Sequence, residues 1–403
     1  MQGVLHLPHF RRLFLAALVS QAGSRMHRVA LLAFIYLLTS NTLWVSLALV
    51  VKLLASAVVG PLLAPWADTQ NRKTLMVLSD VGRAFLTLLI PFLGVSSLPL
   101  LLVLVFGIEV LSSLFDPASQ AAIPELVPEN KLDSANSLMV FAARISEVVF
   151  VGVAGVLVAA VGAQLVFLLD ALSYLVSAVI LRGLPDLPAA GGGGQSYWSR
   201  AREGAEHLLK NPAIRRTVTT LFTAACFGSV EATLGIVMAV KVLEVGTPGF
   251  GAMESALAVG AVLGTLLVPR IVMRLRREQL FFGGLILFGL FEASLGVWPA
   301  FAWVLVALFF SGVFNQVFIV PARSIMQSHT PGPLRGRIFA AFFAVMDTAV
   351  ICGALLAGLL EPVMGAPGVF LLAGVMVSGV SALMLLTGGI PSPKPHPSAQ
   401  PRL

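Results

Sequence analysis

Long, uninterrupted apolar runs recur along almost the whole chain, and they constrain its fold more than any other feature. Runs such as residues 43–64 and 98–116 can cross a bilayer as helices, which takes about 20 mostly apolar residues. A membrane strand would alternate lipid-facing with lumen-facing residues, and these runs do not alternate. The 403 residues are 58% hydrophobic and 11% charged, whereas roughly a quarter of the residues of a soluble domain are charged. We therefore expect an all-α polytopic membrane protein.

The runs divide the chain into twelve predicted transmembrane helices, and the basic residues between them indicate the orientation. On this division the Lys and Arg residues of the loops and ends fall on one side, whereas the opposite loops carry only Lys241. By the positive-inside rule, both termini then face the cytoplasm of a cell-membrane protein. The net charge of +7 reflects this topology, so we expect no nucleic-acid partner. The predicted spans are 13–38, 43–64, 74–93, 98–116, 136–159, 164–182, 214–240, 250–269, 279–297, 301–322, 337–360 and 366–387.

A charged hairpin occurs twice in the sequence. The first copy, GPLLAPWADTQNRKTL at 60–75, and the second, GTLLVPRIVMRLRREQL at 264–280, share a glycine, two leucines, a proline and a basic pair. Gly60 and Gly264 are 204 positions apart. Because each half contains six predicted spans, an even number, the two halves enter the membrane in the same direction. Parallel repeats of this kind are found in transporters whose substrate site lies near the midplane between the halves.

The composition changes between the halves and at the end of the chain. Residues 1–182 are predicted to form the N-terminal six-helix half, and residues 213–387 the C-terminal one. Between them, residues 183–212 contain the flexible stretch PDLPAAGGGGQS, followed by a predicted short amphipathic helix at the cytoplasmic surface. Residues 388–403 are rich in proline, and we expect them to be disordered.

Several charged side chains lie inside the predicted spans, where each costs at least a few kcal/mol and must face the protein interior or a wet cavity. Asp80 and Arg83 are three residues apart, as are Arg144 and Glu147. Each pair is predicted to neutralise itself on one helix face. Glu254 is near the outer end of its span and is predicted to have a surface role.

The hairpin at 60–75 resembles the signature loop of the major facilitator superfamily, Gly-x-x-x-Asp-Arg-x-Gly-Arg-Arg, with Asp68, Arg72 and Lys73 at the charged positions. The stretches SDVGRAF, FDPASQAAIPELVPENKLDSANSL, DALSYLVSA and LRGRIFAAF resemble the branch that includes the enterobactin exporter and the macrolide efflux proteins. One departure is Gly23-Ser24-Arg25, where members of that branch commonly have Asp after the Gly. The resemblance implies twelve helices in two parallel halves.

By this resemblance, the first, fourth, seventh and tenth spans line a central cavity. Arg25 has no oppositely charged residue within one turn of its helix, so it must meet a carboxylate across the cavity or an anionic group of the substrate. A carboxylate in an apolar cavity can exchange protons near neutral pH. For each residue, the alternative is a buried pair between helices. The predicted substrate-binding residues are Gln21, Arg25, Glu109, Glu231 and Asn315. The predicted proton-coupling residues are Glu231, Glu109 and Asp347.

The resemblance also implies a gate at the hairpin. Asp68 is expected to stabilise the state that is closed on the cytoplasmic side by contacting the start of the eleventh span, because a helix N-terminus attracts anions. Arg72 is expected to reach Asp116 at the end of the fourth span. The predicted gating residues are Gly60, Asp68, Arg72, Lys73 and Asp116.

The sequence has no P-loop, no G-x-S-x-G motif and no Cys/His spacing for zinc, so we expect neither an enzyme nor a bound cofactor or metal. Without a nucleotide site, the energy for transport must come from an ion gradient. We therefore expect a monomeric secondary active exporter of amphipathic small molecules, such as a drug or a siderophore, driven by proton antiport. Two alternatives are a transporter of a lipid or lysolipid, and a membrane sensor or scaffold that transports nothing.

Overall fold

Each predicted apolar run forms a helix in the computed structural model. The structure describes residues 3–67, 69–94, 96–189, 206, 208, 210–272, 275–330 and 335–390, and this part of the chain contains no strand. Most of the predicted linker helix, the chain end beyond residue 390 and the predicted gating residue Asp68 lie outside the described residues.

The N-terminal half contains six long helical segments. Its second segment consists of α2 and α3, which are joined by a π-helical turn at Ala55–Val59. The helices are α1 (Pro8–Thr39), α2 (Thr42–Leu54), α3 (Gly60–Ala67), α4 (Arg72–Leu93), α5 (Leu98–Leu126), α6 (Leu132–Val161) and α7 (Ala163–Arg182).

The C-terminal half repeats this layout with five helices, the last of which is long and kinked. α9 continues through a π-helical turn at Met238–Val242. The helices are α9 (Pro212–Val237), α10 (Gly246–Val272), α11 (Arg277–Val297), α12 (Phe301–Ser328) and α13 (Arg335–Leu386).

The helices of the described residues can be compared with the twelve predicted spans. Within the described residues, ten helices are long and apolar enough to cross a membrane. One of these is α13, which has a break at Gly365 (φ 69°, ψ 162°) and provides two spans. α1 has 32 residues but is more polar, because it includes Arg25, His27 and Arg28. The predicted all-α membrane fold is confirmed.

Asparagine and proline residues determine where several helices begin. The side chains of Asn41, Asn71 and Asn211 each accept a hydrogen bond from a backbone N–H in the first turn of α2, α4 and α9. Such caps satisfy donors that have no partner within the helix. Pro8 and Pro212 lie in the first turns of α1 and α9, where proline removes no helical hydrogen bond.

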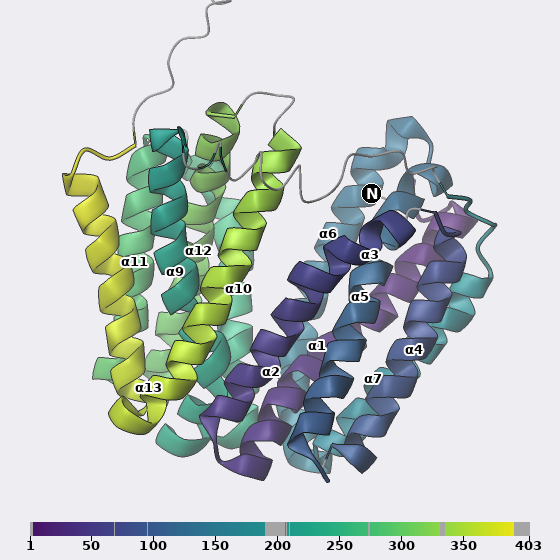
Figure 1. Cartoon of the computed structure of the whole chain (residues 1–403), viewed down its shortest axis with the longest axis horizontal. Helices are drawn as coiled ribbons and strands as arrows, with labels where there is room; N and C mark the ends of the chain where they lie inside the picture. Colours follow the sequence, from purple (N-terminus) through teal and green to yellow (C-terminus); the bar gives the residue numbers. More distant parts are fainter. Residues whose placement is uncertain are drawn as a thin grey trace, which may run out of the picture.

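The two halves lie side by side and diverge toward one end (Figure 1). We call this the linker end, because residues 69–71 and 183–189 lie there, and we call the opposite one the far end. Across the halves, α6 packs on α10 and α2 packs on α13. Gly155 and Gly251 allow α6 and α10 to approach closely, since a Cβ atom added at Gly155 would lie 2.8 Å from Gly251 Cα. The closest contacts between the halves therefore lie toward the far end.

The apolar core has the same asymmetry. One cluster of buried residues contains members of both halves, for example Phe167 and Phe250. The other large clusters each belong to a single half, around Phe115 in the N-terminal half and Phe281 in the C-terminal half. The halves thus share a core toward the far end and have separate cores toward the linker end.

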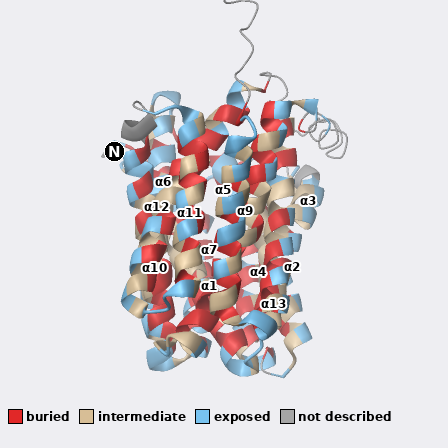
Figure 2. Ribbon diagram, turned by 90° about the vertical axis from the view of Figure 1, so that its left-hand side faces the viewer, coloured by how far each residue is buried: buried red, intermediate tan, exposed pale blue. Residues whose placement is uncertain are grey.

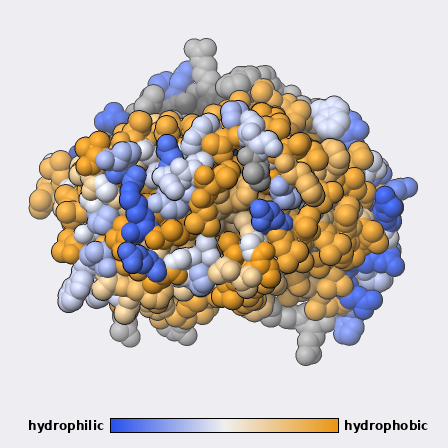
Figure 3. Space-filling model, turned by 90° about the horizontal axis from the view of Figure 1, so that it is seen from below, coloured by the Kyte–Doolittle hydropathy of each residue, from blue (hydrophilic) through white to orange (hydrophobic). Residues whose placement is uncertain are grey.

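The outer surface is apolar, as a membrane protein requires. On α4, Leu78, Phe85 and Phe92 are 62%, 60% and 66% exposed, whereas Asp80 and Arg83 are buried. This is the reverse of a soluble helix, which buries its apolar face. Exposed residues occur along the length of the helices as well as at their ends (Figure 2). The far end, seen from below, also shows mostly apolar residues with scattered hydrophilic groups (Figure 3).

Candidate functional site

Two cavities contain most of the charged residues of the predicted spans. The N-half cavity, of about 660 Å³, is lined by α1, α2, α4, α5, α6 and α7. The C-half cavity, of about 290 Å³, is lined by α9, α10, α11 and α12 together with residues of α1 and α6. Arg28 of α1 lines both, so the two cavities meet at this side chain.

The N-half cavity contains three of the predicted substrate-binding residues, Gln21, Arg25 and Glu109. Lys52 Nζ of α2 lies 3.3 Å from Glu109 Oε2 of α5. Arg25 Nη1 lies 3.5 Å from Glu147 Oε1 of α6, a residue that lines the C-half cavity. Each ion pair joins two helices, and all four side chains are only partly buried. The cavity can therefore offer charged groups of both signs to a ligand.

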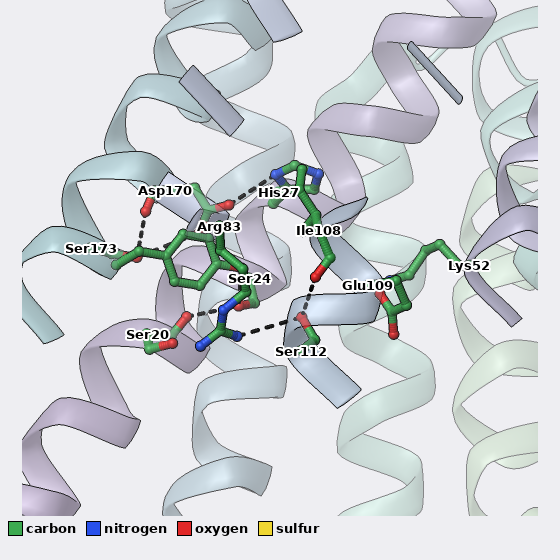
Figure 4. A network of polar contacts seen from close by, with 11 residues as sticks. Ser20, Ser24, His27, Lys52, Arg83, Ile108, Glu109, Ser112, Asp170 and Ser173 are labelled. Carbon is green, nitrogen blue, oxygen red and sulfur yellow. Dashed lines mark hydrogen bonds and ion pairs between the residues drawn. The ribbon is translucent and has the colours of Figure 1, made fainter. Parts of the chain in front are cut away.

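A second group of polar contacts involves other residues that line this cavity, among them Arg83 and His27. Arg83 forms the predicted ion pair with Asp80 on α4, and its guanidinium lies 4.4 Å from the ring centroids of both Phe115 and Tyr174. Cation–π contacts of this kind stabilise a desolvated guanidinium. His27 Nδ1 lies 2.9 Å from Asp170 Oδ2 of α7. Figure 4 shows Arg83, His27 and Asp170 grouped together, with the pair of Lys52 and Glu109 beyond Ser112.

An ion pair between the halves connects the two cavities. Arg28 Nη2 donates a hydrogen bond of 2.6 Å to Glu254 Oε2 of α10, and Arg28 Nη1 lies 3.8 Å from Glu147 Oε1. Glu254 is only 7% exposed. The predicted surface role of Glu254 is therefore wrong, because Arg28 reaches it from the other half. The sequence analysis missed Arg28, although its position three residues after Arg25 places both on one face of α1.

The C-half cavity contains a group of carboxylates. Glu231 of α9, Glu254 of α10 and Glu292 of α11 line it, together with the amides of Asn315 and Gln316 on α12. Glu231 and Asn315 are the other two predicted substrate-binding residues. The half-buried Asp347 of α13, predicted to couple protons, lines neither of these two cavities.

A second polar link between the halves lies closer to the far end. Glu361 of α13 accepts a hydrogen bond of 3.1 Å from Thr42 Oγ1 of α2 and one of 2.7 Å from Lys241 Nζ. Thr42 belongs to the N-terminal half, whereas Glu361 and Lys241 belong to the C-terminal half. Sequence reasoning did not single out Glu361, because nothing near it in the chain indicates its partners.

Comparison with known proteins identifies the family. Residues 4–396 match the family described as transmembrane secretion effector. The chain belongs to this family. The chain is 28% identical over 385 residues to the uncharacterized MFS-type transporter YfiS of Bacillus subtilis, covering 91% of this chain and 90% of YfiS. It is 25% identical over 402 residues to the enterobactin exporter EntS of Shigella boydii, covering 94% and 92% of the two chains.

A solved structure shows the same fold. The nucleoside transporter NupG superimposes on this protein with a TM-score of 0.77, at 12% identity and over 94% of this chain and 98% of NupG. The predicted resemblance to the major facilitator superfamily is confirmed by the family match and the relatives. The protein is therefore a membrane transporter and not an enzyme.

The hairpin at residues 60–75 makes different contacts in this structure from those expected of the gate. Arg72 contacts the Glu125 carboxylate and donates a hydrogen bond of 3.1 Å to the Ala121 carbonyl oxygen, rather than reaching Asp116. The predicted fourth span ended at Asp116, but α5 continues to Leu126 through two prolines. Buried residues in this extension belong to the linker-end core of the N-terminal half, and their packing offsets the hydrogen bonds that proline removes.

The other predicted gating residues are dispersed. Asp116 lines the N-half cavity. Lys73 Nζ lies 3.8 Å from Asp186 Oδ1, which comes after α7. Gly60 lies at the start of α3, where an added Cβ atom would be 3.2 Å from Ser113 Cβ of α5. Arg72, Lys73 and Gly60 thus contact other parts of the N-terminal half. Asp116 instead lines a cavity.

Proposed function

We propose that this transporter is a proton-coupled exporter of amphipathic small molecules that works by alternating access. The observation that carries the proposal is a pair of charged cavities at the junction of two halves whose closest contacts lie at one end. Rocking of one half against the other around such a site would expose it to each side in turn. The similarity to the exporter EntS supports outward transport, of a drug or a secreted metabolite such as a siderophore.

The N-half cavity has the size and lining for such a substrate. Its volume of about 660 Å³ lies in the usual range for small-molecule sites, roughly 300 to 1,000 Å³. Leu31, Val105 and Ile108 contribute apolar surface, while Gln21 and Arg25 offer polar contacts. We assign proton exchange to Glu231 and Glu109, because both line cavities, and not to Asp347. A monomer surrounded by membrane lipid would be sufficient for this activity.

The excess of Lys and Arg in the loops on one side of the membrane supports a cytoplasmic position for the linker end. Because the halves diverge at that end, the structure then represents a state open toward the cytoplasm. This predicts opposite accessibility for cysteines at the two ends of the molecule. In a background with Cys226 and Cys352 replaced by Ser, Asp186→Cys should react with a membrane-impermeant maleimide only after the cells are permeabilised. Pro299→Cys, in the far-end loop between α11 and α12, should react in intact cells. Labelling in the reverse pattern would contradict the orientation.

Transport by the wild-type protein tests the proposed function directly. Proteoliposomes are loaded with a panel of drugs, siderophores and lysolipids, and each compound is followed with and without a pH gradient. A small molecule should move only when the gradient is present, and a protonophore should stop it. Movement of lysolipids alone would favour the lipid alternative. No gradient-dependent movement, despite binding of panel members, would favour a sensor or scaffold.

A further inference from the structure

Two buried carboxylates in the C-half cavity lack a cationic partner. Glu231 and Glu292 are 7% and 2% exposed, and neither forms an ion pair within the described part of the chain. The two basic residues that line the cavity are already engaged, Arg28 with Glu254 at 2.6 Å and Arg144 with Glu147 at 3.7 Å. An ionised carboxylate that is buried without a counter-charge is costly. The cavity is therefore short of positive charge.

One oxygen atom in this cavity is buried and unsatisfied. Glu231 Oε1 has no hydrogen-bond partner among the described residues, although Glu231 lines the cavity. Buried polar atoms in proteins nearly always have a partner. Because the Glu231 side chain lines the cavity, a ligand there that donates a hydrogen bond to its carboxyl group would reduce the cost of burying it.

The two cavities differ in their balance of charge. Arg25, Lys52 and Arg83 join Arg28 around the N-half cavity, where the carboxylates are Glu109 and Asp116. The C-half cavity has the opposite excess. Its carboxylates are those of Glu147, Glu231, Glu254 and Glu292, and its basic groups are those of Arg28 and Arg144. A cation would thus be favoured in the C-half cavity.

The rest of the lining favours an organic cation over a metal ion. Leu257, Ala261 and Val262 of α10 form an apolar wall, and Phe288 of α11 contributes an aromatic ring, whose face attracts organic cations. Within the described residues, no group of three or more His, Cys, Asp or Glu side chains converges closely enough to hold a metal ion. The cavity thus offers carboxylates, an apolar wall and an aromatic ring to one ligand, a combination that suits an organic cation.

Building on the proposed function, we propose that the C-half cavity binds the ammonium group of an amphipathic amine through Glu231 and Glu292. The ammonium donates hydrogen bonds to the two carboxylates, and the adjoining apolar part of the ligand packs on Phe288 and the α10 wall. The substrate class of the exporter is then an organic amine with an apolar body, whose charged end binds in the C-half cavity at Glu231 and Glu292.

Binding of three ligands that share one apolar body tests this assignment. The full-length protein in lipid nanodiscs is titrated calorimetrically with 4-phenylbutylamine, 4-phenylbutanol and 4-phenylbutanoate, with protein-free nanodiscs as the blank. The amine should bind at least about tenfold more tightly than the alcohol, and the carboxylate most weakly, as expected for a charge-assisted hydrogen bond to a buried carboxylate. Equal affinities for amine and alcohol would overturn the proposal.

Substitutions locate the binding group. Glu231→Gln and Glu292→Gln should each weaken amine binding by about tenfold or more. The conservative Glu231→Asp should keep the preference for amine over alcohol, which separates loss of charge from loss of structure. Glu129→Gln, at an exposed turn before α6, is the matched control and should bind like the wild type. Amine binding that survives both Gln variants would overturn the proposal.

Two further results separate this inference from others. Displacement of the amine by NaCl but not by an equal concentration of choline chloride would indicate a site for an inorganic cation, and would overturn the amine assignment. Gradient-driven transport of neutral or anionic compounds without amine binding would overturn this inference and leave the proposed function standing. Amine binding without transport of any compound would support the amine site but would contradict the proposed function as an exporter.

Discussion

Export driven by a pH gradient is expected to stop when Glu231 and Glu109 are both replaced by Gln. An amide has nearly the shape of a carboxyl group but cannot take up and release a proton, so the double variant loses the proposed route for coupling. In the wild type, protonation of Glu109 would also weaken its 3.3 Å ion pair with Lys52 and thus the link between α5 and α2. The measurement is the initial rate of substrate movement in proteoliposomes, which should fall to the rate of vesicles without protein.

Exchange of substrate across the membrane without a pH gradient provides the control for this double variant. Exchange needs alternating access but no net movement of protons, so at saturating substrate it should continue. Glu129→Gln should export at the wild-type rate, because its side chain is exposed and lies in neither cavity. If the double variant still exports at the wild-type rate under a gradient, Glu231 and Glu109 do not couple transport to protons.

Replacing Gly155 with Ala is expected to hold the two halves apart at the far end. The added methyl group would lie 2.5 Å from the Thr247 carbonyl oxygen and 2.8 Å from Gly251 Cα, and neither backbone atom can move without shifting α10. Overpacking of this kind costs about 1 to 3 kcal/mol. A balanced equilibrium between two states would then shift by about 5- to 150-fold toward separated far ends, since 1.4 kcal/mol corresponds to tenfold.

Distances between spin labels at the far end measure this shift. Labels on Ser96→Cys, between α4 and α5, and on Pro299→Cys report on the two halves, and their distance distribution should move to longer values in Gly155→Ala. Gly283→Ala is the matched control, because a Cβ atom added there meets nothing within 4 Å. An unchanged distribution in Gly155→Ala would show that this contact does not limit closure of the far end.

The all-α membrane fold and the order of its apolar helices could be predicted because hydropathy acts locally along the chain. The repeated hairpin likewise indicates two related halves from the sequence alone. The five predicted substrate-binding residues all line one of the two cavities, although their role in binding stays a prediction. Their placement followed from the cost of charge in a membrane, which directs such groups away from lipid.

The partners of the charged groups could not be predicted in the same way. Arg28 and Glu254 are 226 residues apart and meet only because α1 and α10 approach each other across the halves. The spacing along one helix shows which residues share a face, but not which helix that face meets. The contact of Arg72 with Glu125 in this structure could not be predicted for a related reason. Packing extends α5 beyond its prolines and brings Glu125 to the hairpin.

The π-helical turn at Ala55–Val59 has a consequence for movement between the halves. On the far-end side of this turn, Ser46 of α2 lies against Gly358 of α13, which belongs to the C-terminal half. On its other side, Gly60 at the start of α3 lies against Ser113 of α5, which belongs to the N-terminal half. A rocking motion would therefore pull the two ends of one continuous segment in different directions. A π-helical turn is a common site of local irregularity in a helix, so this segment can act as a hinge, and the hairpin would stay with its own half while the far end opens.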